Sequence, residues 1–317
     1  MFIAHKRILP SRKAIKTPAN GYTMTSIETT HRKAAPMPRT RPFAQVDVFS
    51  PEAYGGNPLA VIVDAEGMSE QDMQRIARWT NLSETTFILP PTSNEADYRL
   101  RIFTPGGELP FAGHPTLGSA HAWLEHGGTP HAPERIIQEC QAGMIPIRPD
   151  DNGTLSFAAP PTTRTGPLEH EFLERIVDAF GIDPSQVSAH QWVDNGPGWA
   201  VLRLATAQEV LDLDPDLSRI PDAMVGAIGA YPPGSPAAFE MRTFAPRVGV
   251  KEDPVCGSMN ASVGQWLART GETTHPYTIS QGTTLGRTGR ITITPDTNGT
   301  IWIGGNTTTL FHGTALA

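Results

Sequence analysis

Cysteine is scarce in this sequence: Cys140 and Cys256 are the only two among 317 residues. Two thiols are too few for a disulfide framework or a structural zinc set, so the chain fits a reducing compartment. Long apolar runs are absent too, since none approaches the roughly 20 residues that cross a bilayer, and the N-terminus lacks the apolar stretch of a secretory signal. We therefore expect a cytoplasmic protein with no membrane span and no metal site.

Positive charge is also in short supply. Lys and Arg number 25 against 32 Asp and Glu, and the formal net charge at pH 7 is −7. Phosphate backbones are bound by clustered Lys and Arg, so this balance argues against a nucleic-acid partner. The glycine pairs lack the spacing of a P-loop or a dinucleotide fingerprint, which argues against a nucleotide cofactor. A small-molecule partner is the better expectation.

The first part of the chain differs from the rest. Residues 1–42 carry nine Lys and Arg and a single acid, Glu28, without sustained apolar periodicity. We interpret this segment as a disordered basic tail. A dispensable extension or an over-called start codon, with Met24 or Met37 as later starts, is favoured over an organelle transit peptide.

The rest of the sequence contains an internal duplication. Three landmarks recur in the same order: residues 56–63 and 196–203, residues 103–119 and 244–258, and residues 152–157 and 298–303. Three echoes in register favour two copies of one supersecondary plan over coincidence. We therefore expect two similar domains, 43–160 and 161–317, related by a pseudo-two-fold axis with a cleft between them.

Strand and helix patterns are mixed within each half. Residues 43–49 alternate as a half-buried strand does, and Ser69 has N-cap chemistry for a helix that follows it. Further elements are expected as strands at 59–63, 86–89 and 98–103, helices from Pro115 to Leu124, 172–180 and 255–267, and tight turns at 151–153 and 297–299. The fold class is α+β, with strand-rich halves that each hold a helix at the repeated motif.

Each half places a Gly/Pro-rich loop at a strand-to-helix junction. Unpaired backbone N–H groups and the helix dipole make such a junction a site for an anion. Gly113 and Gly257 allow close backbone approach, while Ser119 and Ser258 can cap the helix or reach a ligand. Either loop alone could simply be a well-capped helix, but two facing one cleft would hold a carboxylate.

Three titratable residues form the candidate catalytic set. His114 and Asp253 each directly precede a proline, so we treat them as equivalent positions in the two halves. Taken singly, His114 could be a structural histidine, Asp253 a turn cap and Glu84 a solvated acid. Together they supply a carboxylic acid, an imidazole and a carboxylate, which suits proton removal and return at carbon or an allylic proton shift.

Four separated motifs resemble the PhzF-like isomerase family of phenazine biosynthesis, in that family's order and spacing. They are Asp47–Phe49 with Gly55–Pro58, Asn81–Phe87, Phe103–Pro105 with Glu108–Pro115, and Glu252–Ser258. The resemblance runs from about Phe43 to the C-terminal region. It implies a diaminopimelate-epimerase-like fold of two pseudo-symmetric domains, each a curved sheet or barrel around a central helix, with the active site between them and often a homodimer.

The resemblance also implies roles for individual residues. Glu84 matches the family's acid/base glutamate, and the pocket-lining residues of the family match Ser83, Gly113, His114, Asp253, Gly257 and Ser258. The phenazine member isomerises trans-2,3-dihydro-3-hydroxyanthranilate by moving a proton around the ring without metal or coenzyme. We therefore expect a cofactor-independent isomerase of a small carboxylate, with an amino-acid epimerase or racemase, or a non-catalytic scaffold of this fold, as alternatives.

One departure from the wider fold concerns cysteine. Related amino-acid racemases and epimerases use two opposing cysteines, one in each repeated loop. Here the first position is Ala112 and the second is Cys256. A two-cysteine mechanism is therefore unavailable. Cys256 is expected to be a small buried residue, with a minor role opposite Glu84 as the alternative.

Overall fold

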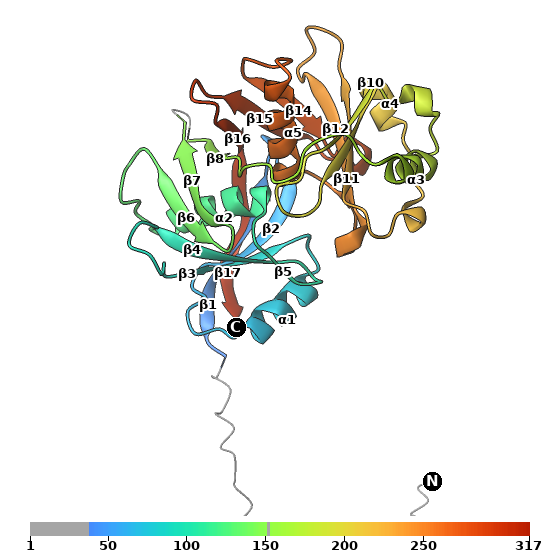
Figure 1. Cartoon of the computed structure of the whole chain (residues 1–317). Coiled ribbons are helices and arrows are strands. Elements are labelled where there is room, and N and C mark those ends of the chain that lie inside the picture. Colours follow the sequence, from blue (N-terminus) through green and yellow to red (C-terminus); the bar gives the residue numbers. More distant parts are fainter. Residues whose placement is uncertain (1–37, 151–152) are drawn as a thin grey trace, which may run out of the picture. The chain divides into compact units, whose positions relative to one another are not determined.

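The computed structural model describes residues 38–150 and 153–317 (Figure 1). Residues 1–37 of the predicted basic tail lie outside the described residues, as do Asp151 and Asn152 of the first predicted turn. The first strand begins at Thr40, three residues before the predicted start at Phe43. Among the helices described, none combines the length and the apolar character that a bilayer crossing requires.

Seventeen strands of the described residues join into one mixed sheet. In the first half they are β1 (Thr40–Val48), β2 (Asn57–Ile62), β3 (Thr85–Leu89), β4 (Tyr98–Phe103), β5 (Glu108–Leu109), β6 (Ile136–Cys140), β7 (Gly143–Pro149) and β8 (Leu155–Ala158). In the second half they are β9 (Ala189–Trp192), β10 (Ala200–Thr206), β11 (Val225–Ala230), β12 (Phe239–Ala245), β13 (Val250–Asp253), β14 (Tyr277–Gln281), β15 (Gly289–Pro295), β16 (Ile301–Gly305) and β17 (Thr307–Leu316).

The order of strand pairing is the same in the two halves. β1 is antiparallel to β2, β2 is parallel to β3, and β3 is antiparallel to β4. β9, β10, β11 and β12 repeat this order. β4 and β12 then each pair with one short antiparallel strand and one parallel strand, and two antiparallel strands follow. The halves are joined where β8 pairs with β16 and where β17 pairs with β1.

Five α-helices and four 3-10 turns accompany the described strands. They are α1 (Glu70–Thr80), α2 (Gly113–Glu125), α3 (His170–Phe180), α4 (Ala207–Leu211), α5 (Gly257–Arg269), η1 (Pro184–Gln186), η2 (Leu217–Arg219), η3 (Pro246–Val248) and η4 (Thr283–Leu285). The Ser69 side chain accepts a hydrogen bond from the Asp72 N–H, and α1 buries Met73 and Ala77. The predicted N-cap of this helix is therefore confirmed.

Helices α2 and α5 are the buried ones. Leu117 of α2 and Leu267 of α5 belong to one hydrophobic cluster that spans both halves. The sequence predicted α2 to begin at Pro115, but the structure begins it at Gly113. Pro115 instead lies inside the first turn, where its missing N–H removes no intrahelical hydrogen bond. The N-terminal ends of both helices can therefore contribute backbone N–H groups to a site.

Candidate active site

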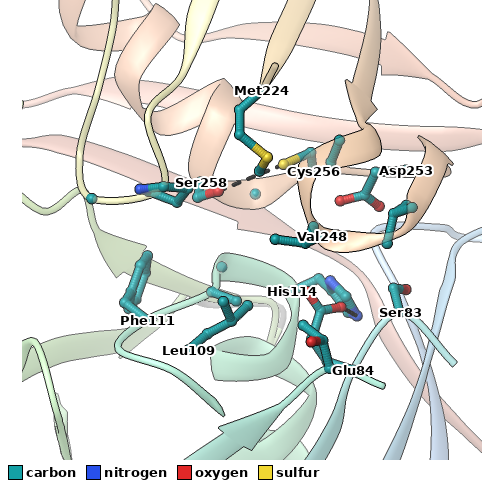
Figure 2. Close-up of a pocket in the computed structure, with 18 of the residues that line it drawn as sticks. Ser83, Glu84, Leu109, Phe111, His114, Met224, Val248, Asp253, Cys256 and Ser258 are labelled. Carbon is teal, nitrogen blue, oxygen red and sulfur yellow. Dashed lines mark hydrogen bonds and ion pairs between the residues drawn. The ribbon is translucent and has the colours of Figure 1, made fainter. Parts of the chain in front are cut away.

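A cavity of about 220 Å³ lies at the N-terminal ends of α2 and α5 (Figure 2). Its polar lining includes Ser83, Glu84, Gly113, His114, Arg247, Asp253, Cys256, Gly257 and Ser258, and its apolar lining includes Leu109, Phe111, Trp199, Met224 and Val248. Every residue predicted for the site except Ser119 thus lines one cavity. Ser119 is buried away from it, and its hydroxyl donates to Thr86 Oγ1 at 2.8 Å.

The first turns of α2 and α5 touch through two glycines. A Cβ placed on Gly113 would lie 2.7 Å from the Gly257 Cα, and a Cβ on Gly257 would lie 2.8 Å from the Gly113 Cα. No side chain fits at either position. The backbone N–H groups of Gly113, His114, Gly257 and Ser258 have no acceptor among the described residues. Two positive dipole ends in contact therefore present four free donors, which suits a carboxylate.

Glu84 directly precedes β3 and has only 8% of its surface exposed. Burial, and to a lesser extent the charge of Asp253, raise the pKa of Glu84 well above its usual value, while a hydrogen bond from Ser83 partly opposes this. The Glu84 Oε2 has no hydrogen-bond partner among the described residues. A buried carboxyl with a free oxygen and a raised pKa is suited to exchanging a proton near neutral pH.

His114 lies in the first turn of α2 and faces Glu84, with its Nε2 3.5 Å from the Glu84 Oε2 (Figure 2). Its Nδ1 lies 3.2 Å from the Asn57 amide nitrogen, whose shorter hydrogen bonds go to Asp253 and Val255. Because an amide nitrogen can only donate, an Nδ1 that faces it is assigned as the acceptor and the ring proton is assigned to Nε2. Burial lowers the pKa of His114 to about 3, so the ring is neutral at physiological pH. His114 therefore directs an N–H, and no positive charge, toward Glu84.

Asn57, fully buried at the start of β2, links the other polar residues. Its amide nitrogen donates to Asp253 Oδ1 at 2.7 Å, and its amide oxygen accepts from the Ser83 hydroxyl at 3.2 Å. Burial raises the pKa of Asp253 to about 6, and the Asn57 hydrogen bond is among the contacts that oppose the rise. No role was predicted for Asn57 from the sequence. Its position could have indicated one, because Asn57 begins an apolar strand and a buried amide needs hydrogen-bond partners.

Cys256 and Ser258 lie at the start of α5, with the thiol 3.6 Å from the Ser258 hydroxyl (Figure 2). The Trp199 indole N–H donates to the same hydroxyl at 3.1 Å. Burial, followed by the charge of Asp253, raises the pKa of Cys256 well above its usual value. Cys256 therefore stays a protonated thiol. Among the described residues, no three His, Cys, Asp or Glu side chains group as metal ligands would.

The predicted equivalence of His114 and Asp253 is wrong. His114 is the second residue of α2, whereas Asp253 ends β13 before α5 begins. The prolines that suggested the match have different places: Pro115 lies inside its helix and Pro254 precedes its helix. Proline occurs both before and within a first helical turn, so it does not fix the alignment.

Strand register gives the correct alignment of the halves. Leu109 pairs with Ile102 of β4 as Asp253 pairs with Thr243 of β12. The registers of β2 with β3 and of β10 with β11 extend the alignment to the residues before β3 and β11. The equivalent pairs around the cavity are Glu84 and Met224, Leu109 and Asp253, Ala112 and Cys256, and His114 and Ser258.

Known proteins share this fold. A solved hydroxyproline epimerase from Agrobacterium vitis has a TM-score of 0.56 and 13% identity, and the match covers 87% of this chain and 91% of that one. A solved phenazine biosynthesis protein of the PhzF family from Bacillus anthracis has a TM-score of 0.71 and 25% identity, over 88% of this chain and 100% of that one. The chain therefore has a mixed α/β fold of the epimerase-like class.

Sequence comparison places the chain within that class. Antisense-enhancing sequence 1 of Schizosaccharomyces pombe is 38% identical over 293 residues, which is 86% of this chain and 97% of that protein. Trans-2,3-dihydro-3-hydroxyanthranilate isomerase of Pseudomonas fluorescens is 36% identical over 250 residues, 76% of this chain and 86% of that one. The family model of phenazine biosynthesis-like proteins, PhzC-PhzF, matches residues 46–313. The chain belongs to this family and is a PhzF-family isomerase.

Proposed function

We propose that this isomerase moves a proton between two carbons of a small carboxylate, with Glu84 as the acid/base residue. The observation that carries the proposal is the buried Glu84 carboxyl, whose free Oε2 lies 3.5 Å from His114 beside the paired helix N-termini. A raised pKa brings this carboxyl closer to the working pH, where both of its protonation states are accessible.

The substrate carboxylate binds at the four free N–H groups of α2 and α5. Binding there places the adjacent carbons against the face of the cavity that Glu84 occupies. When Glu84 takes a proton from an activated carbon, the electron pair delocalises toward the bound carboxylate, where the N–H groups stabilise it. The Glu84 carboxyl exchanges this proton with solvent and delivers a proton to a second carbon, so the reaction is a balanced isomerisation that incorporates solvent hydrogen.

His114 and Asp253 support this transfer. The His114 Nε2–H donates to Glu84 or to a substrate oxygen, while Asp253, held by Asn57, accepts from a polar group of the substrate. The Pseudomonas relative named for trans-2,3-dihydro-3-hydroxyanthranilate supports a reaction of that type. That compound is the first substrate to test.

The test is solvent deuterium incorporation. Candidate carboxylates, including trans-2,3-dihydro-3-hydroxyanthranilate, are incubated with the enzyme in deuterated buffer and scored by mass gain. Glu84→Gln should lower the exchange rate at least about a thousandfold, because it removes the group that carries the proton. Glu240→Gln is the matched control, since Glu240 is also a buried acid but does not line the cavity. Wild-type exchange by Glu84→Gln would overturn the assignment.

A second candidate function is epimerisation at an α-carbon. Cys256 lines the same cavity as a protonated thiol, so it can supply a proton from a face other than that of Glu84. Deuterium entering with inversion would show this reaction, whereas entry at a second carbon would show isomerisation.

The two-domain division at residues 43–160 and 161–317 and the homodimer are part of the same proposal. The repeated strand order and the central places of α2 and α5 support the division. β17 returns from the second half to pair with β1, so the two domains are also joined by a shared pair of strands.

The homodimer is a separate part of the proposal, and light scattering of the purified chain tests it.

A further inference from the structure

The cavity contains one cationic side chain that the proposed mechanism does not use. Arg247, in η3, lines the cavity together with the acids Glu84 and Asp253. His114, the other basic residue of the lining, is neutral because burial lowers its pKa to about 3. Within residues 38–150 and 153–317, Arg247 is therefore the only lining residue that carries a positive charge at neutral pH.

The Arg247 guanidinium makes no hydrogen bond or ion pair with the described residues. Its backbone N–H, by contrast, is held by the Ala223 carbonyl at 3.4 Å. The hydrogen bond from Arg175 and, least of the causes, the charge of Arg247 lower the pKa of Asp222, and the Asp222 carboxylate is paired with Arg175 at 2.5 Å. The five donors of the Arg247 side chain are thus available to a ligand.

The loop before β10 lies next to the Arg247 guanidinium. A Cβ placed on Gly198 would lie 3.2 Å from Arg247 Nη1, and Gly198 has a φ of +91° that disfavours any other residue. Asp194 fixes the loop by accepting from the N–H groups of Gly196 at 2.8 Å and Gly198 at 2.6 Å. Gly196 and Pro197 line the cavity as well. The Arg247 side chain is exposed, and its guanidinium lies beside this loop at the edge of the cavity lining.

We propose that Arg247 binds a second anionic group of the substrate, which makes small dianions such as dicarboxylates better ligands of this site than monocarboxylates. This inference rests on the proposed function, in which the N–H groups of α2 and α5 bind the first carboxylate. A planar guanidinium matches a carboxylate with two parallel hydrogen bonds. Apolar side chains also line the cavity, among them Leu109, Phe111 and Met224 (Figure 2), and they fit an unsaturated carbon body.

Binding of inert ring carboxylates tests the inference without turnover. Benzoate, isophthalate and terephthalate are titrated by calorimetry into the wild type, Arg247→Gln and Arg175→Gln. Arg175 is the matched control, because it is a nearby arginine that does not line the cavity. We expect one of the dicarboxylates to bind the wild type about tenfold to a hundredfold tighter than benzoate. Arg247→Gln should remove this preference, and Arg175→Gln should retain it.

The outcomes separate this inference from the proposed function. A preference for dicarboxylates that survives in Arg247→Gln, or no binding of any of the three compounds, overturns the inference. The same titrations in Glu84→Gln ask about binding alone. Suppose that Glu84→Gln binds a dicarboxylate more tightly than benzoate, that adding Arg247→Gln removes this preference, and that the wild type exchanges deuterium into no mono- or dicarboxylate. That result would keep the inference about Arg247 and reject the proton transfer by Glu84. If the wild type and Arg247→Gln exchange deuterium into monocarboxylates at equal rates and neither prefers a dicarboxylate, the proton transfer is kept and the inference about Arg247 is rejected.

Discussion

The two halves of this protein share a backbone plan down to individual ion pairs. In the first half Arg101 of β4 pairs with Glu108 of β5 through two hydrogen bonds of 2.6 Å. In the second half Arg242 of β12 pairs with Glu252 of β13 through two of 2.9 Å. Each pair lies just before the loop that leads into a buried helix. The scaffold under the cavity is therefore duplicated.

The cavity itself is not duplicated in its chemistry. Glu84 stands where the second half has Met224, and Asp253 stands where the first half has Leu109. Asn57 of the first half then holds Asp253 of the second. A symmetric scaffold therefore carries an asymmetric site, to which each half contributes part of the polar set. Equivalent substitutions should have equal effects where the two halves bury the equivalent residues alike, and unequal effects where burial or chemistry differs.

Among equivalent pairs of substitutions, the largest expected effect is equal in the two halves. Gly113→Ala and Gly257→Ala each force a methyl group against the backbone of the other helix, so the free N–H groups separate. We expect each to lower turnover at least about a hundredfold and to cost about 1–3 kcal/mol of stability. Gly107→Ala is the control, because nothing lies within 4 Å of its added Cβ. A difference of more than tenfold in turnover between the two variants would show that the two helix ends are not equivalent.

The next effect belongs to the link between the halves. Asn57→Ala removes the hydrogen bonds to His114 and Asp253 and should lower kcat about tenfold to a hundredfold. Because the Asn57 hydrogen bond lowers the pKa of Asp253, its loss should raise that pKa further above 6. Carboxyl NMR titration checks the shift. An unchanged Asp253 pKa would show that Asn57 only fills space.

The two Arg–Glu pairs should differ in energy because they differ in burial. The Arg242 and Glu252 side chains are 8% and 10% exposed, whereas those of Arg101 and Glu108 are 24% and 25% exposed. Arg242→Met leaves a buried acid unpaired and should cost about 3 kcal/mol, against about 1 kcal/mol for Arg101→Met. Urea denaturation measures both. Equal costs would mean that burial does not distinguish the pairs.

His114 and Asp253 should make stability depend on pH in opposite directions. The pKa of His114 is lowered, so its contribution is complete above pH 6.5 and is lost as the pH falls through about 3. The pKa of Asp253 is raised from 3.8, so its contribution is complete below pH 3.8 and is lost as the pH rises through about 6. His114→Asn should therefore make stability fall more steeply with rising pH than in the wild type, and Asp253→Asn should reverse this.

The slopes of unfolding free energy between pH 4 and 6 check this prediction. Each variant should change the slope by at most about 1.4 kcal/mol per pH unit, the value for one proton. Slopes that move in the same direction in both variants would contradict the opposite pKa shifts.

The smallest effect is expected at Cys256, whose equivalent in the first half is Ala112. Cys256→Ala makes the two positions identical and should change isomerisation less than about twofold, because Glu84 both takes and returns the proton. Loss of turnover with an unchanged melting temperature would instead give Cys256 a catalytic role.

Short-range patterns predicted much of the fold. The N-cap at Ser69 and the strand Tyr98–Phe103 are found as expected, because caps and strand alternation depend on neighbouring residues. The starts of α2 and α5 were placed two residues away from Gly113 and Gly257. A proline fits the first turn as well as the residue before it, so it cannot mark the boundary. The predicted domain limits and residue roles stay predictions.

Short motifs in a fixed order were enough to predict the duplication, the family and the motif residues among those that line the cavity. Trp199, Met224 and Arg247 join the lining through the tertiary fold, which also sets how the predicted residues are used. Asn57 reaches Asp253 across 196 positions of the chain, and the closeness of Gly113 to Gly257 depends on packing two helices from different halves. The protonation of Glu84, His114 and Asp253 follows from burial, which is a property of the folded chain and of no local segment.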